Sequence, residues 1–266
     1  MKARIRRRLK HGGLALGGAL LAWGLWAAWT YSLQDASFLT GWLLLGLVVA
    51  LTLFNVRKKL PFLPLLPART WLQIHVYVGL VTVVVFLLHA GPRVPNGILE
   101  VTLAVLFAVV ALSGVAGLFL SRMVPSRLRT RGEVVLFQRQ PKLRRRLRER
   151  LEERVDEVES TAVSDFYVRR LLPFFEEHRN FWWHLAQSRR PRRELVDELE
   201  GLERYLDDDE REIVREIEEL IRKKDDLDYH HAHQSLLKRW LFVHVPVTYS
   251  LLVVAVVHAT IVYGWG

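Results

Sequence analysis

Four histidines lie inside long apolar stretches of the sequence, where a side chain that can carry charge is costly. His75 and His89 share one stretch and His244 and His258 another, and each pair is separated by 14 residues. On an α-helix 14 residues make nearly four turns and rise about 21 Å, so both histidines of a pair lie on one face at two depths. Neutral imidazole is a good axial ligand for haem iron. This spacing therefore predicts two haem sites, stacked between two helices.

The elements that must position these histidines are membrane-spanning helices. Crossing the hydrocarbon layer takes about 20 apolar residues of helix. Stretches of this kind occupy residues 12–33, 38–56, 71–90, 98–120 and 240–265. The first stretch follows a basic start, as a signal peptide does, but its apolar part is longer than a signal core and predicts a retained helix. We therefore expect an all-α integral membrane protein with a bundle of five transmembrane helices.

The composition narrows the chemistry further. The 266 residues are 51% hydrophobic and 25% charged, and they include no cysteine. This excludes disulfides, thiolate zinc sites, cysteine-ligated iron–sulfur clusters and covalently attached c-type haem. The formal net charge of +10 comes mainly from the N-terminal arm and from the loop between the second and third apolar stretches. That distribution is typical of membrane topology, and we expect no nucleic-acid partner.

The positions of the cations predict the orientation, because short cytoplasmic loops are enriched in Lys and Arg. Six basic residues precede the first stretch and four lie between the second and third, whereas Arg93 is the only cation of the two opposite loops. We therefore expect the N-terminus inside and the C-terminus outside, in a bacterial cytoplasmic (inner) membrane. Stretches 71–90 and 240–265 then run in the same direction.

Parallel helices bring the histidines level with one another. His75 then faces His244 near the inside, and His89 faces His258 near the outside. We expect two b-type haems, one held by each pair, as two steps by which an electron crosses the hydrocarbon layer. A single intramembrane histidine also has an ordinary interpretation, since it can form a hydrogen bond between helices or line a cavity. The alternative of another class is thus a haem-free membrane scaffold or transporter subunit with a His-lined path.

The His pairs on the third and fifth helices resemble those of the ferric-reductase-like transmembrane family, which includes the membrane part of NADPH oxidases. A more distant resemblance is to the di-haem cytochrome b of respiratory, quinol-oxidising complexes. The resemblance covers helices 2 to 5 and implies that the four histidines are axial ligands and that electrons cross from the inner haem to the outer one. The chain differs in its long charged segment between helices 4 and 5, and it has no Gly-rich dinucleotide fingerprint. We therefore expect a subunit of a complex rather than a self-contained NADPH-dependent reductase.

Charged residues near the ends of the apolar stretches are candidate partners for the haems. Haem propionates are anionic, and Arg69, Arg122 and Arg239 at the inner boundary and Arg93 at the outer one are candidate partners for them. Glu100 is the one acidic residue within an apolar stretch. It is either a proton acceptor for a quinol oxidised near the outer haem or a boundary residue that reaches water.

These residues together predict a membrane electron-transfer protein. We expect it to pass electrons between a quinone or a cytoplasmic-side donor and a redox partner on the outer side, either another redox subunit or a cytochrome. The alternative within redox chemistry is a transmembrane metal reductase that delivers electrons to ferric iron. The lipid bilayer is an expected partner in every case.

Residues 121–239 form a highly charged segment between the fourth and fifth apolar stretches. Its apolar residues recur at helical spacing and predict a cytoplasmic helical insertion, between domains at 1–120 and 240–266. The sequence Asp-Tyr-His-His-Ala-His at 228–233 is either a metal site or a solvated interfacial turn. The sequence Phe-Trp-Trp at 181–183, flanked by His178 and His184, is either part of the core of this domain or a face at the membrane surface.

Overall fold

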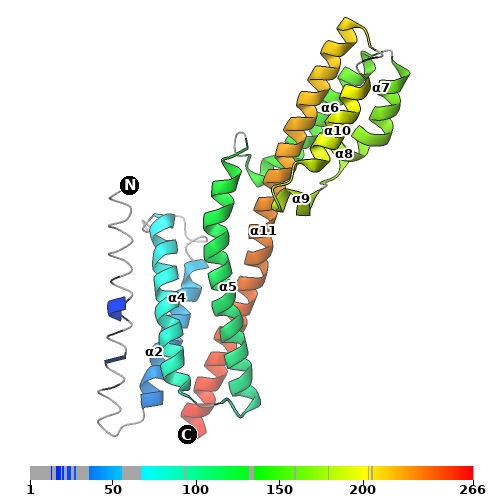
Figure 1. The fold of residues 1–266 in the computed structure, drawn as a ribbon. Helices are drawn as coiled ribbons and strands as arrows, with labels where there is room; N and C mark the ends of the chain where they lie inside the picture. The colour runs from blue at the N-terminus through cyan, green and yellow to red at the C-terminus, as the bar shows by residue number, and fades with distance from the viewer. Residues whose placement is uncertain are drawn as a thin grey trace. The chain divides into compact units, whose positions relative to one another are not determined.

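A computed structural model of the chain describes residues 36–55, 67–92, 94–131, 135–158, 160–178, 180–202, 204 and 206–265, with a few positions between 13 and 27. Every extended regular element in these residues is a helix, as the composition predicts (Figure 1). The first predicted span lies almost wholly outside the described residues. The chain divides into two compact units. We call Met1–Leu118 with Trp240–Gly266 the apolar unit and Phe119–Arg239 the charged unit.

The apolar unit is built from helices of nearly unbroken apolar sequence. They are α2 (Ala36–Thr52), followed by the short 3-10 helix η1 (Leu53–Asn55), then α4 (Ala68–Ala90), most of α5 (Ile98–Leu128) and the last part of α11 (Asp208–Trp265). Three of these, α4, α5 and α11, contain stretches long and apolar enough to cross a membrane. Helix α2 has 17 residues and rises only about 25 Å, short of the roughly 30 Å hydrocarbon layer. The long apolar helices indicate a membrane protein, while the bundle of five spans stays a prediction.

The outer surface of the apolar unit is itself apolar. Phe242 is 80% exposed and Leu112 is 71% exposed, and many other large apolar side chains of these helices are exposed too. Monomeric soluble proteins rarely expose an apolar surface of this extent. In a lipid bilayer the same surface contacts acyl chains, which explains helices that are hydrophobic on all sides.

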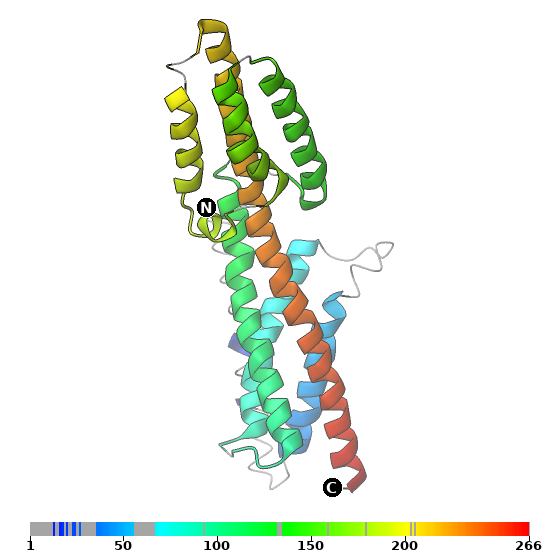
Figure 2. The same cartoon turned by 90° about the vertical axis from the view of Figure 1, so that its right-hand side faces the viewer.

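The directions of the helices within the apolar unit agree with the predicted topology. Helix α4 and the apolar part of α11 run in the same direction, and α5 runs antiparallel to both (Figures 1 and 2). Helix α4 ends at Ala90 and is followed by Gly91, whose positive φ of 62° is a conformation that favours glycine. Helices α4 and α5 are joined by the stacked rings of Phe86 and Phe107, whose centroids are 3.9 Å apart.

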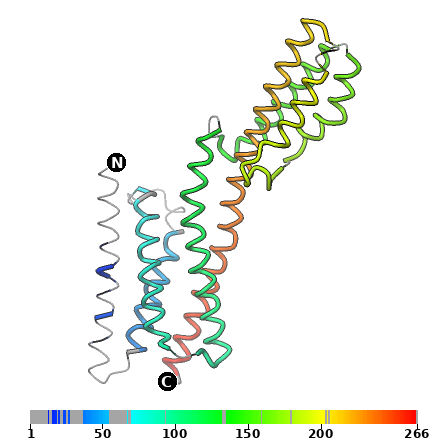
Figure 3. Tube along the Cα trace, viewed as in Figure 1, coloured from blue at the N-terminus to red at the C-terminus, as the bar shows by residue number. Residues whose placement is uncertain are grey.

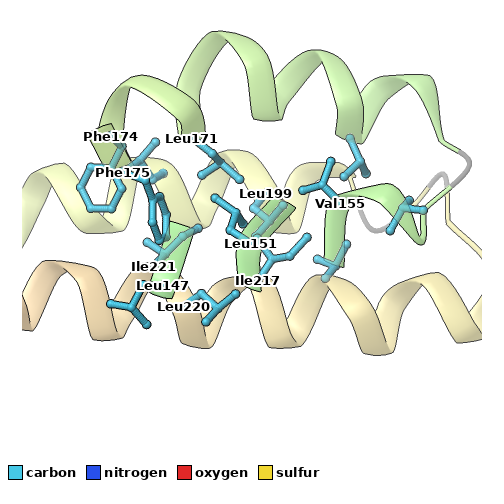
Figure 4. Close-up of a cluster of buried hydrophobic side chains, with 14 of the residues drawn as sticks. Leu147, Leu151, Val155, Leu171, Phe174, Phe175, Leu199, Ile217, Leu220 and Ile221 are labelled. Carbon is cyan, nitrogen blue, oxygen red and sulfur yellow. The ribbon is translucent and has the colours of Figure 1, made fainter. Parts of the chain in front are cut away.

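The charged unit is a helical bundle with its own core. Its elements are the start of α11, the end of α5, η2 (Phe137–Arg139), α6 (Gln140–Asp156), α7 (Thr161–Phe166), the π-helical turn η3 (Tyr167–Leu171), α8 (Leu172–Glu176), α9 (Phe181–Leu185) and α10 (Arg190–Leu202). Leu151, Phe175, Leu199 and Ile217, from four of these helices, are almost fully buried in one apolar cluster (Figure 4). The unit covers nearly the same residues as the predicted helical segment 121–239. Its cytoplasmic location stays a prediction.

Helix α11 belongs to both units. It is one continuous helix of 58 residues, with Pro246 inside it (Figure 3). Hydropathy alone divides this stretch at Trp240, because the charged residues before that position and the apolar residues after it suit different surroundings. The backbone hydrogen bonds of an α-helix do not depend on whether its side chains are charged or apolar, so the helix continues through this position. The last predicted span is therefore only the second half of a much longer helix.

Candidate functional site

The structure places the four membrane histidines on two helices and brings two of them to one cavity. His75 and His89 lie on α4 and His244 and His258 on α11, and all four side chains are partly buried. His89 and His258 line the same cavity. His75 and His244 lie on the same two helices, about four turns from His89 and His258. The cavity agrees with the outer pair that the spacing and the parallel helix directions predict, and the inner pair stays a prediction.

The cavity shared by His89 and His258 lies between four helices. Its walls come from α2, α4, α5 and α11 and are mainly aliphatic and aromatic, with Val48, Phe107 and Leu251 among them. Apolar walls with two imidazoles are suited to a flat apolar group that binds through a metal. The chemistry of this lining fits a haem held by two histidines.

His89 is held by the start of α2. Its Nδ1 lies 3.0 Å from the backbone oxygen of Ser37 and 3.2 Å from Oγ1 of Thr40. The Thr40 hydroxyl donates to the same carbonyl at 3.1 Å. A carbonyl oxygen only accepts, so Nδ1 of His89 carries the ring proton and donates it. The lone pair that can bind a metal is then on Nε2.

Gly41 allows α2 to approach His89 closely. A Cβ atom added at Gly41 would lie 3.0 Å from Cε1 of His89 and 3.5 Å from its Nδ1. The shorter of these contacts is tighter than ordinary van der Waals packing. A larger residue at this position would therefore push against the imidazole that Ser37 and Thr40 orient.

His244 is held in the same tautomer by α5. The Ser113 hydroxyl donates to the backbone oxygen of Val110 at 2.9 Å. The contact of 2.7 Å between Ser113 Oγ and His244 Nδ1 is therefore a hydrogen bond donated by the imidazole. As in His89, the lone pair is left on Nε2.

Trp240 adds a second contact between α5 and α11 at this level. Its indole stacks on the His244 ring at 5.1 Å, and its Nε1 donates to the backbone oxygen of Ser113 at 2.7 Å. A Cβ at Gly117 would lie 1.9 Å from the indole, so the indole occupies the space that a larger side chain would need. Ser113 and Gly117 on one helix thus fix Trp240 and His244 on the other.

His75 has no such partner among the described residues. Its Nδ1 is buried without a hydrogen bond to any of them, and the ring lies 4.8 Å from that of Phe54. Buried polar atoms in proteins are normally paired. No hydrogen bond to a described residue therefore fixes the tautomer of His75, in contrast to His89 and His244.

Glu100, the predicted proton acceptor, lies at the start of a helix. Glu100 is exposed in the first turn of α5, and its carboxylate accepts a hydrogen bond from the Asn96 backbone N–H at 3.2 Å. A carboxylate is favourable at a helix N-terminus for electrostatic reasons alone. Its role towards a quinol stays a prediction. Arg93 and the side chain of Arg69 lie outside the described residues.

The two remaining arginines belong to the charged unit. Arg122 is exposed, and the Arg239 guanidinium lies 4.7 Å from the centroid of the Phe181 ring. Neither observation tests the predicted contact with haem propionates.

The histidine cluster at 228–233 is not a turn, contrary to one of the two predictions for it. It lies inside α11, where His230 and His233 are almost fully buried. The His230 Nε2 donates to the backbone oxygen of Arg131 at 2.8 Å, and the His233 Nδ1 donates to that of Tyr229 at 3.0 Å. Among the described residues no three His, Asp or Glu side chains are grouped as metal ligands would be. These histidines act as polar links in the packing of the charged unit.

The fold and the site define a helical membrane protein with two pairs of histidines in its apolar unit. No protein-family model, curated protein or solved structure matches the chain. The function must therefore be argued from the site itself. Ser37, Thr40, Gly41 and Ser113 are site residues that the sequence did not predict. For Thr40, Gly41 and Ser113, a hydroxyl group or a glycine within an apolar stretch is a signal that could have found them; Ser37 contributes a backbone oxygen and carries no such signal.

Proposed function

We propose that the protein is a membrane b-type cytochrome that binds two haems and transfers electrons across the bilayer. His75 and His244 hold the inner haem, and His89 and His258 hold the outer one. The observation that carries the proposal is the placing of His89 and His258, from two parallel helices, on one apolar cavity. The bound haem iron supplies one-electron redox chemistry.

The hydrogen bonds of the histidines support this assignment. Metal-bound histidines almost always donate their second ring N–H to a carbonyl or another acceptor, which fixes the tautomer and the ring orientation. His89 does so to Ser37 and His244 to Ser113. His75 differs from these two, because its Nδ1 has no hydrogen-bond partner among the described residues.

The residues of the chain determine the distance between the two proposed haem sites and the polarity around them. The helical rise over 14 residues separates the two His pairs by about 21 Å along the helix, so neither site alone spans the hydrocarbon layer. The aliphatic walls of the outer cavity exclude water, and exclusion of water tunes a redox potential. We propose a quinone or a cytoplasmic-side donor and an outer-side redox partner, within a complex. Reduction of ferric iron outside the membrane is the alternative use of the same two sites.

Single replacements of the outer histidines test the proposal. The variants His89→Ala and His258→Ala should each retain one haem of two, and the double variant should lose no more than either single one. His178→Gln, in the charged unit, is the control and should retain both. His258→Met keeps an iron ligand and should raise the midpoint potential of one haem. Unchanged haem content in the two alanine variants would refute the pairing, and a wild-type protein without haem would favour the scaffold or transporter alternative.

A further inference from the structure

Helix α9 exposes two neighbouring tryptophans. Trp182 is 76% exposed and Trp183 is 47% exposed, whereas His184 beside them is buried in the charged unit. The predicted alternative of a core position is thus wrong for these two indoles. A pair of exposed indoles on one short helix is unfavourable in water and is typical of a surface that meets something else.

The chain around α9 is strongly basic. Residues 178–193 contain five arginines and no acidic residue, although segment 121–239 as a whole holds 27 Lys and Arg against 26 Asp and Glu. Arg189, Arg190 and Arg193 are exposed, and Arg190 forms an ion pair with Glu194 at 2.8 Å. Indoles prefer the headgroup level of a bilayer, and arginines near them attract anionic lipids. This combination fits a lipid surface better than it fits a protein groove.

Contacts within the charged unit tie α9 to α5 and α11. The Arg127 guanidinium donates to the backbone oxygen of Leu185 at 3.0 Å, and the Arg239 guanidinium lies over the Phe181 ring. Arg127 is in the last turn of α5, and Arg239 directly precedes the apolar part of α11. Both ends of α9 are therefore tied to α5 and α11, the two helices that continue into the apolar unit.

We propose that α9 and the arginines at 189–193 form a bilayer-docking face that binds the anionic headgroup region of the membrane. Trp182 and Trp183 insert at the headgroup level, and the exposed arginines contact lipid phosphates. The face holds the charged unit against the membrane from which its helices emerge. This inference does not depend on haem.

The absence of cysteine makes a direct test available in the full chain. A nitroxide is attached to the variant Trp182→Cys, and the protein is reconstituted in nanodiscs of phosphatidylcholine with phosphatidylglycerol. Arg145→Cys, whose native side chain on α6 is 81% exposed, is the matched control. Collision with oxygen should exceed collision with a water-soluble nickel chelate at position 182, and the reverse should hold at position 145.

The charge of the face is tested by a second change in the protein labelled at position 182. Adding Arg189→Glu, Arg190→Glu and Arg193→Glu should weaken docking by about fivefold or more for each lost arginine and return position 182 to the values of the control. A nitroxide at Trp183→Cys repeats the measurement if position 182 perturbs folding. Equal nickel accessibility at positions 182 and 145 would overturn the proposal. Protection of position 182 from both reagents would also overturn it, because protein rather than lipid would then cover the face.

Discussion

The hydroxyl oxygen of Ser113 on α5 lies 2.7 Å from Nδ1 of His244 on α11. Because that hydroxyl donates its own proton to Val110, the contact fixes both the tautomer and the orientation of the imidazole. Ser113 is thus a positioning residue, through which the proposed inner haem can be tested without removal of a ligand.

Replacement of Ser113 by alanine should weaken the inner haem site. Loss of a partner that orients a metal ligand typically lowers affinity by about 10- to 100-fold. The measurement is haem retention during dilution of the purified protein in detergent, followed by the reduced haem spectrum. Thr102→Ala is the matched control, because Thr102 is exposed on the same helix and its hydroxyl donates to the backbone oxygen of Ile98, one turn earlier. Equal retention in both variants would contradict a positioning role, and Ser113→Thr should restore binding.

Replacement of Gly41 by alanine should disturb the outer site alone. The added Cβ would lie 3.0 Å from the His89 ring, whereas a Cβ at Gly46 on the same helix has no atom of the described residues within 4 Å. We expect Gly41→Ala to shift or lose the signal of one haem and Gly46→Ala to leave both haems unchanged. The check is the number of haems per chain and their separate midpoint potentials. Indistinguishable titrations for the two variants would show that His89 is not held at this point.

The sequence could predict the helices and the His pairs because both follow from local pattern. Apolar length marks a span, and a 14-residue interval places two side chains on one face. Ser113 could not be assigned to His244 in this way, since 131 residues separate them and only the packing of α5 on α11 joins them. The contact of Gly41 with His89 likewise depends on how closely α2 packs on α4.

The sequence pattern could not predict which polar residues are buried in the charged unit. A lysine normally predicts a solvated position. Lys224 is nevertheless fully buried, with its ammonium bonded to Asp228 and to the backbone oxygen of Glu177. Those partners come together only in the tertiary structure.

Replacement of Lys224 by methionine should destabilise the protein strongly. Burial lowers the pKa of Lys224, and Asp228 beside it opposes that shift. Removal of one partner of a buried ion pair typically costs about 3–5 kcal/mol. The neighbouring Lys223 is exposed and pairs with Glu219, so Lys223→Met should cost less than about 1 kcal/mol. Thermal unfolding of the full chain in detergent compares the two, and equal melting temperatures would contradict the prediction.

The charged unit should lose stability in mild acid. Burial lowers the pKa of His184 to about 4 and that of His231 to about 4, below the ordinary value of 6.5. The unfolded chain therefore takes up protons at these sites first, and stability falls as the pH drops below 6.5. Burial raises the pKa of Asp225 to about 6, so this carboxyl group adds stability as the pH falls. It is one group against two histidines, and we expect the loss of stability to be larger.

The variant His184→Leu tests this dependence. Both ring nitrogens of His184 are buried, and neither has a hydrogen-bond partner among the described residues. An apolar side chain of similar size should therefore be neutral or stabilising at pH 7. At pH 5 the free energy of unfolding of the variant should exceed that of the wild type by about 2 kcal/mol more than it does at pH 7. Melting temperatures at the two pH values provide the readout. The prediction fails if the pH dependence of the variant equals that of the wild type.

The central claim is that the four membrane histidines hold two haems. Its most direct test is the haem content of the purified full-length protein, taken from the dithionite-reduced-minus-oxidised spectrum and from extracted haem per chain. The account predicts a b-type spectrum with two haems per chain. A protein that is folded, contains all four histidines and binds no haem would contradict it.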